Sequence, residues 1–129
     1  MIPKVLLFDL DDTLRRSNKT LSRRTVDVLN RCAEKGLLIG LCTSRSERNI
    51  APFVDQLHPD IVIASGGAVV RFRGAYIWVS EFTEEETRTL IDTARKICGD
   101  KAEIAVDTLH YQYWNYSVDP NITDPSWGP

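Results

Sequence analysis

The chain has 129 residues, of which 43% are hydrophobic, and this is enough for one domain with a modest core. Its formal net charge is −2, which gives no indication of nucleic acid or an anionic membrane surface as a partner. The apolar stretch near the N-terminus is too short for a signal peptide or a membrane span, and no other segment approaches spanning length.

The three cysteines, Cys32, Cys42 and Cys98, are odd in number and lack the C-x-x-C spacing of zinc and redox sites. They therefore indicate neither a disulfide framework nor a zinc site. We expect reduced thiols, buried as small apolar residues, in a cytoplasmic protein.

Four consecutive apolar residues, Val5 to Phe8, predict a first strand that is buried on both faces. Three carboxylates follow it directly: Asp9, Asp11 and Asp12. Closely spaced like charges resist desolvation, and a divalent cation removes that cost. Mg²⁺ prefers oxygen ligands and keeps waters and substrate phosphate around it, so one or two of these carboxylates suffice. The plain alternative is an acidic turn, in which aspartates bond nearby backbone groups.

The next segments alternate between helix and strand. Ser22 is placed as an N-cap, Gly36 lies where the first helix should end, and Pro52 suits the first turn of a second helix. We expect a helix from about 22 to 35, a strand over 37–42, a helix from about 51 to 57 and a strand over 61–64. This alternation predicts a parallel sheet with right-handed crossovers.

The second half of the chain begins with a predicted β-hairpin around Arg73-Gly74, formed by 68–72 and 75–79. Thr83 and Glu86 have the spacing of a capping box and open a third helix, which ends before Gly99. Two further strands are expected over 102–106 and 111–116, followed by an irregular, proline-containing tail from Ser117.

Polar residues follow each of the three predicted parallel strands, and ligands of such sheets bind beyond the carboxyl ends of the strands. These residues are Asp9, Asp11 and Thr13 after the first strand, Thr43, Ser44 and Arg45 after the second, and Ser65, Gly66 and Gly67 after the third. Taken singly, a threonine at a strand end is usually a cap and a glycine pair is usually a turn. Together they predict one convergent polar site.

The pattern Asp9-x-Asp11-x-Thr13 after a hydrophobic strand resembles the first motif of the haloacid dehalogenase (HAD) superfamily, and Thr43 after the second strand resembles its second motif. The resemblance implies that Asp9 attacks phosphorus to form an aspartyl-phosphate and that Asp11 acts as general acid and then general base. It also implies that the Thr43 hydroxyl binds a nonbridging phosphate oxygen. These roles are chemically reasonable for carboxylates.

Two further segments, 41–45 (Leu-Cys-Thr-Ser-Arg) and 65–68 (Ser-Gly-Gly-Ala), resemble the Thr-Gly-Arg and Asn-Gly-Ala segments of Cof-like sugar-phosphate phosphatases. The resemblance implies a Mg²⁺-dependent phosphatase for small phosphorylated metabolites, with Asp9 and Asp11 as metal ligands. The residues it assigns to substrate or phosphate binding are Leu10, Asp12, Thr13, Ser44, Arg45 and Gly66.

The fold that the resemblance implies is α/β: a three-layer, Rossmann-like HAD core with a parallel sheet and a β-hairpin after the third strand, followed by the start of an α+β cap. We place the core at 1–80 and the beginning of an incomplete cap at 81–129. The family's third-motif lysine and fourth-motif acids are not evident. Their nearest candidates are Lys96, Lys101, Asp119 and Asp124.

The chain is therefore expected to be the N-terminal portion of a longer phosphatase and to be inactive alone. The alternative is a noncatalytic HAD-like binding or regulatory module. A nucleotide-binding domain is disfavoured, because no Gly-rich loop follows the first strand. In the sheet order that the resemblance implies, the second neighbour of the first strand lies in the missing C-terminal part. We therefore expect an exposed apolar edge that self-associates or pairs with that part.

Basic residues cluster after the acidic motif. We expect a solvated loop there rather than a surface that attracts an anionic substrate. The members of the cluster are Arg15, Arg16, Lys19, Arg23 and Arg24.

Overall fold

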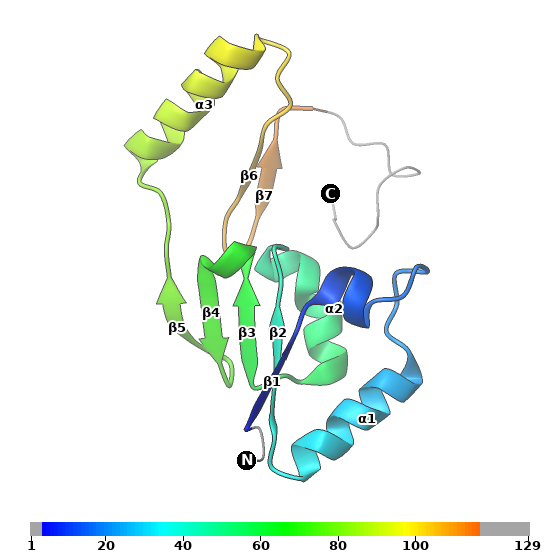
Figure 1. The fold of residues 1–129 in the computed structure, drawn as a ribbon. Coiled ribbons are helices and arrows are strands. Elements are labelled where there is room, and N and C mark those ends of the chain that lie inside the picture. Colours follow the sequence, from blue (N-terminus) through cyan, green and yellow to red (C-terminus); the bar gives the residue numbers. More distant parts are fainter. Residues whose placement is uncertain (1–3, 117–129) are drawn as a thin grey trace. The chain divides into compact units, whose positions relative to one another are not determined.

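The computed structural model describes residues 4–116, and the chain divides into two compact units between Val79 and Ser80 (Figure 1). The first unit holds a five-stranded sheet and two α-helices, and the second holds one α-helix and a two-stranded sheet. Among residues 4–116, no helix combines the length and the apolarity needed to cross a membrane.

The sheet of the first unit has the strand order β1-β2-β3-β4-β5. Its first three strands are parallel, and the last two turn back as an antiparallel hairpin, so the predicted sheet and hairpin are confirmed. Arg73 and Gly74 form the hairpin turn with φ angles of 48° and 83°, the left-handed conformation that a tight two-residue turn needs. The strands are β1 (Val5–Phe8), β2 (Leu38–Cys42), β3 (Ile61–Ala64), β4 (Val69–Phe72) and β5 (Ala75–Val79).

Two helices, α1 (Arg23–Glu34) and α2 (Glu47–Leu57), cover one face of this sheet (Figure 1). Right-handed crossovers that advance in one direction along a parallel sheet place both helices on the same side. The predicted N-cap is confirmed, because Ser22 Oγ accepts a hydrogen bond from the N–H of Thr25 at 2.9 Å. The buried residues between helices and sheet are Leu29, Ile39, Leu41, Ile50, Phe53, Leu57, Val62, Ala64 and Val69.

Helix α2 begins at Glu47, four residues before the start that we predicted near Ala51. Pro52 therefore lies inside the helix, a position that costs about 3 kcal/mol or more because proline lacks an N–H and its ring clashes with the preceding turn. The buried side chains of Ile50, Phe53 and Leu57 lie on one helix face, and burying each of them contributes about 1.5–3 kcal/mol. This tertiary packing outweighs the local preference that guided the prediction.

The opposite face of the sheet is open in the part of the chain that the structure describes. The pairing of neighbouring strands places Val5, Leu7, Phe72 and Trp78 on this face, where they are 41%, 50%, 36% and 60% exposed. Residues 4–116 thus supply two of the three expected layers, the sheet and one layer of helices. The prediction that the first strand is buried on both faces is wrong for these residues, because the helices cover one face only.

The second unit begins with helix α3 (Glu84–Cys98), whose predicted capping box is confirmed. The N–H of Thr83 donates to Glu86 Oε2 at 2.8 Å, and the N–H of Glu86 donates to Thr83 Oγ1 at 3.2 Å. The helix ends at Cys98, directly before Gly99, as expected.

Strands β6 (Ala105–Asp107) and β7 (Gln112–Trp114) form the antiparallel pair of the second unit and are shorter than predicted. The side chain of Asn115 replaces part of the ladder, because it bonds to the N–H of Ile104 and the carbonyl of Ala102, each at 2.8 Å. The predicted tail from position 117, with the candidate acids at 119 and 124, lies outside the described residues.

An ion pair ties the hairpin to the start of α2. Arg71 Nε donates to Glu47 Oε1 at 3.0 Å, and the Glu47 side chain is only 8% exposed. The Tyr76 hydroxyl donates to Glu47 Oε2 at 3.4 Å, and the Arg71 guanidinium lies 5.8 Å from the centre of the Tyr76 ring. Loss of hydration, together with the Glu47 carboxylate, raises the pKa of Tyr76.

Replacing Glu47 should test this connection. We expect Glu47→Gln to lower the free energy of unfolding by about 1–3 kcal/mol, because Arg71 loses its counter-charge in a partly buried site. Urea denaturation measures this change, and the variant should also lower the pKa of Tyr76 in an absorbance titration. The control is Glu84→Gln, which removes the partner of Arg88 in a pair where Glu84 is 80% exposed and should matter little. Equal losses of stability in the two variants would contradict the assignment.

Strand β1 is an edge of the sheet as far as residues 4–116 show. The N–H of Leu38 donates to the carbonyl of Lys4 at 2.9 Å. Because backbone groups alternate in direction along a strand, those of Val5 and Leu7 point away from β2. The side chains of these two residues are also exposed, so the expected apolar edge is present and offers a template for another strand.

We predict that the chain self-associates through this edge. Sedimentation velocity over a range of concentrations should detect the association, and Leu7→Lys should shift it toward monomer, because a charge on an edge strand opposes strand pairing. The control is Val28→Lys on α1, where an apolar side chain of similar exposure, 47%, lies on a helix without free strand backbone. A wild-type chain that stays monomeric at high concentration would refute the prediction.

Candidate active site

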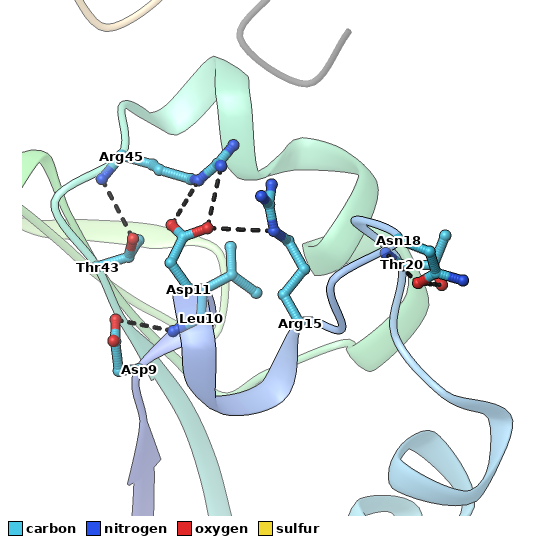
Figure 2. A network of polar contacts seen from close by, with 8 residues as sticks. All are labelled: Asp9, Leu10, Asp11, Arg15, Asn18, Thr20, Thr43 and Arg45. Atoms are coloured by element: carbon cyan, nitrogen blue, oxygen red, sulfur yellow. Dashed lines mark hydrogen bonds and ion pairs between the residues drawn. The ribbon is translucent and has the colours of Figure 1, made fainter. Parts of the chain in front are cut away.

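The acidic segment after β1 folds into one turn over Leu10–Leu14, in which the backbone of Asp11 is extended and that of Asp12 is left-handed (Figure 2). The N–H of Arg15 donates to the carbonyl of Leu10 at 2.9 Å and closes the turn, while the Leu10 side chain is fully buried. Asp9 precedes the turn, and its Oδ1 accepts from the N–H of Leu10 at 2.8 Å. Leu10 therefore anchors the loop in the core, while Asp9 is exposed at the strand end. The hydrogen bond between Asp9 and Leu10 is, by itself, also typical of an acidic turn without a catalytic role.

Asp11 is bound differently, because two guanidinium groups hold its carboxylate (Figure 2). Arg45 donates from Nε to Oδ2 at 2.7 Å and from Nη2 to Oδ1 at 3.0 Å. Arg15 Nε lies 3.2 Å from Oδ1. The Arg45 side chain is 3% exposed and that of Asp11 is 35% exposed, so the carboxylate balances a buried positive charge and still reaches solvent. A partner 34 residues away is not a feature of a local turn.

Thr43 is buried at the carboxyl end of β2 and joins this network. Its hydroxyl oxygen accepts from the N–H of Arg45 at 3.2 Å. Its own N–H donates to the carbonyl of Ile63 at 2.8 Å, and its carbonyl accepts from the N–H of Gly66 at 3.2 Å. The hydroxyl is thereby fixed beside the residue that holds Asp11.

The loop after β3 is hydrogen-bonded to the loop after β2. The N–H of Ser65 donates to the carbonyl of Arg45 at 2.8 Å. Ser65 and Gly66 have φ angles of 51° and 65°, and this left-handed conformation is easy for glycine and rare for serine. The turn therefore depends on Gly66 and brings the β3 end to the β2 end.

The structure thus brings most of the predicted site residues to one end of the sheet. Hydrogen bonds between the loops after β2 and β3 bring Thr43, Arg45 and Gly66 together. The Arg45 side chain binds Asp11 and so places it at the same site. Ser44 lies exposed in the same loop as Thr43. The remaining residues of the acidic turn, Asp12 and Thr13, are exposed, and Asp12 has a left-handed φ of 55°.

The donor chemistry of the acidic turn fits Mg²⁺ in part. Among residues 4–116, no group of three or more His, Cys, Asp and Glu side chains is arranged to hold a metal ion. Asp9 offers an exposed carboxylate, whereas the Asp11 carboxylate contacts Arg15 and Arg45 with both oxygens. Because Mg²⁺ takes few protein ligands besides phosphate and water, this pair can still supply them. Asp11 would then offer its main-chain oxygen or exchange a guanidinium contact.

Arg15 is the site residue that the sequence-based prediction missed. We expected a solvated basic loop, but the Arg15 side chain is 14% exposed and contacts Asp11. The contact depends on the non-helical turn between the two residues, in which Asp11 is extended and Asp12 is left-handed, so helical spacing was not a signal for it.

Comparison with known proteins supports a family assignment. The family of haloacid dehalogenase-like hydrolases matches residues 6–123 of the chain. The 5-amino-6-(5-phospho-D-ribitylamino)uracil phosphatase YwtE of Bacillus subtilis is 29% identical over 66 residues, which are 51% of this chain and 23% of that protein. Protein MG265 of Mycoplasma genitalium is 40% identical over 70 residues, which are 52% of this chain and 24% of that protein.

A solved structure is similar to nearly all of this chain. BT1666 of Bacteroides thetaiotaomicron, which belongs to the phosphatases of the HAD superfamily, aligns with a TM-score of 0.75 and 25% identity. The alignment covers 94% of this chain and 44% of BT1666, so the chain spans about half the length of that relative. The expected α/β fold and family are thus confirmed, and the chain belongs to the haloacid dehalogenase-like hydrolases.

Proposed function

We propose that this chain carries the nucleophile half of a Mg²⁺-dependent phosphatase of the Cof-like branch, which hydrolyses small phosphorylated metabolites. The observation that supports it best is the hydrogen-bonded arrangement of Thr43, Arg45 and Asp11 next to the exposed carboxylate of Asp9. A nucleophile, a second carboxylate and a hydroxyl donor are the groups that phosphoryl transfer requires.

The proposed reaction has two steps. An oxygen of the Asp9 carboxylate attacks phosphorus, the bond from phosphorus to the ester oxygen breaks, and Asp11 gives its proton to the departing alcohol. Water then attacks the aspartyl-phosphate, Asp11 takes the proton of that water, and inorganic phosphate leaves with Asp9 restored. The Thr43 hydroxyl would orient the transferred group by donating to one of its oxygens.

Magnesium would supply charge neutralisation for the transferred phosphoryl group. Asp9 and Asp11 are the residues proposed to hold it, by the carboxylate of Asp9 and by an oxygen of Asp11. The two arginines at Asp11 would compensate the charge of that carboxylate and so reduce its repulsion of a dianionic substrate.

The proposed substrate class is a small sugar phosphate or a related phosphate ester. YwtE acts on a phosphate ester of a ribityl chain, as its name states, and its likeness to this chain over 66 residues supports the class. The residues that the resemblance assigns to substrate or phosphate binding are Leu10, Asp12, Thr13, Ser44, Arg45 and Gly66. We propose that all of them except Arg45, whose side chain is bound to Asp11, would contact the phosphate, and that other residues would contact the remainder of the substrate. We place the core at 1–80 and the start of a cap at 81–129.

A noncatalytic binding module is the second candidate. The ion pairs of Asp11 favour it, because a carboxylate engaged by two guanidiniums is poorly placed to deliver a proton. The free state of Cys32, Cys42 and Cys98 suits a reducing compartment under either candidate, and we propose the cytoplasm.

The two candidates differ in their response to a phosphoryl mimic. We expect isothermal titration calorimetry of this chain to detect BeF₃⁻ binding that is at least about tenfold tighter with Mg²⁺ than without it, and Asp9→Asn should abolish this binding. In a longer form of the protein that releases phosphate from an aryl phosphate, the same variant should abolish turnover.

The matched control is Asp27→Asn, which removes an exposed carboxylate on α1 and should leave the titration unchanged. Binding of Mg²⁺ and BeF₃⁻ without coupling would favour the noncatalytic module. Unchanged coupling in Asp9→Asn would overturn Asp9 as the nucleophile.

A further inference from the structure

The two-pronged contact from Arg45 to Asp11 assigns a role that the sequence did not indicate. Sequence comparison within the Cof-like pattern placed Arg45 among the residues that bind phosphate. In the structure its Nε and Nη2 donate to the two oxygens of Asp11, and only 3% of its side chain is exposed. A buried guanidinium that makes a bidentate contact with a carboxylate is largely neutralised by it and attracts an incoming anion only weakly.

Arg45 is also fixed through its backbone. Its N–H donates to Thr43 Oγ1 at 3.2 Å, and its carbonyl accepts from the N–H of Ser65 at 2.8 Å. One residue therefore joins the β2 loop, the β3 loop and the acidic turn after β1. Because planar guanidinium groups bind carboxylates at both oxygens, the contact sets the orientation of the Asp11 carboxylate as well as its position.

We propose that Arg45 is a positioning residue, which fixes the Asp11 carboxylate relative to the Thr43 hydroxyl and acts on the phosphate site through Asp11. This inference rests on the proposed function. Arg15 contacts Asp11 from within the same turn, with Nε 3.2 Å from Oδ1. Arg45 reaches Asp11 from a different loop, which is itself fixed by main-chain hydrogen bonds, and donates to both carboxylate oxygens.

A double-mutant cycle on folding stability tests the contact without any ligand. Arg45→Met, Asp11→Asn and the double variant should give a coupling of at least about tenfold in the folding equilibrium constant. The control cycle is Arg73→Met with Asp60→Asn, whose ion pair at 3.2 Å includes an arginine that is 65% exposed, and its coupling should be about fivefold or less. A coupling between Arg45 and Asp11 no larger than that of the control would overturn the proposal.

The phosphate site is read by BeF₃⁻ titration in the presence of Mg²⁺. Arg45→Met should weaken binding by about tenfold in the wild-type background and by less than about twofold in the Asp11→Asn background, because its effect passes through Asp11. Arg45→Lys keeps the positive charge but loses the bidentate geometry of the guanidinium. Its BeF₃⁻ affinity should therefore lie between those of the wild type and Arg45→Met.

The outcomes distinguish a failure of the positioning role of Arg45 from a failure of the proposed function. Equal losses in the two backgrounds would mean direct contact with phosphate and would overturn the positioning role alone. A stability coupling without any change in BeF₃⁻ affinity would leave Arg45 a purely structural residue and would also overturn it. A wild-type chain that binds no BeF₃⁻ would overturn the proposed function, and the role of Arg45 in it, whatever the stability cycle gives.

Discussion

The geometry of the site depends on three main-chain hydrogen bonds between the ends of β2 and β3. The bond from Thr43 to Ile63 extends the ladder by one step, and those from Gly66 to Thr43 and from Ser65 to Arg45 join the two loops. Loops after parallel strands are otherwise free to diverge, since the strands alone fix only their starting points. Here main-chain hydrogen bonds beyond the strand ends hold the two loops together.

A charge constraint follows from this arrangement. The fixed β2 loop places the Arg45 guanidinium in a site where only 3% of its side chain is exposed, and a buried charge without a partner would be strongly destabilising. Asp11 meets that need with both carboxylate oxygens. The acidic turn after β1 is therefore linked to the loop after β2 by an ion pair. The position of Arg45 depends on the main-chain hydrogen bonds of its loop, and the position of the Asp11 carboxylate depends on Arg45.

Elements specified by local pattern could be predicted from the sequence, and those specified by contacts between distant segments could not. Thr83 and Glu86 cap α3 as their spacing indicates, because both partners lie within one turn. The start of α2 was predicted too late, since Pro52 disfavours helix locally while Ile50 and Phe53 gain stability only from packing against the sheet. The convergence of the loops followed from strand order, yet the pairing of Arg45 with Asp11 depends on side-chain directions that no spacing reveals.

The contacts that define the site all join residues between Asp9 and Gly66, within the first compact unit. All of these contacts are made between residues of the first unit. They are the burial of Leu10, the hydrogen bond to Thr43 Oγ1 and the bidentate contact of Arg45 with Asp11. The face of the sheet that is open in residues 4–116 carries Leu7 and Trp78, and neither takes part in this network. The arrangement of Asp11, Thr43 and Arg45 is thus fixed by hydrogen bonds within the first unit, independently of the open face of the sheet.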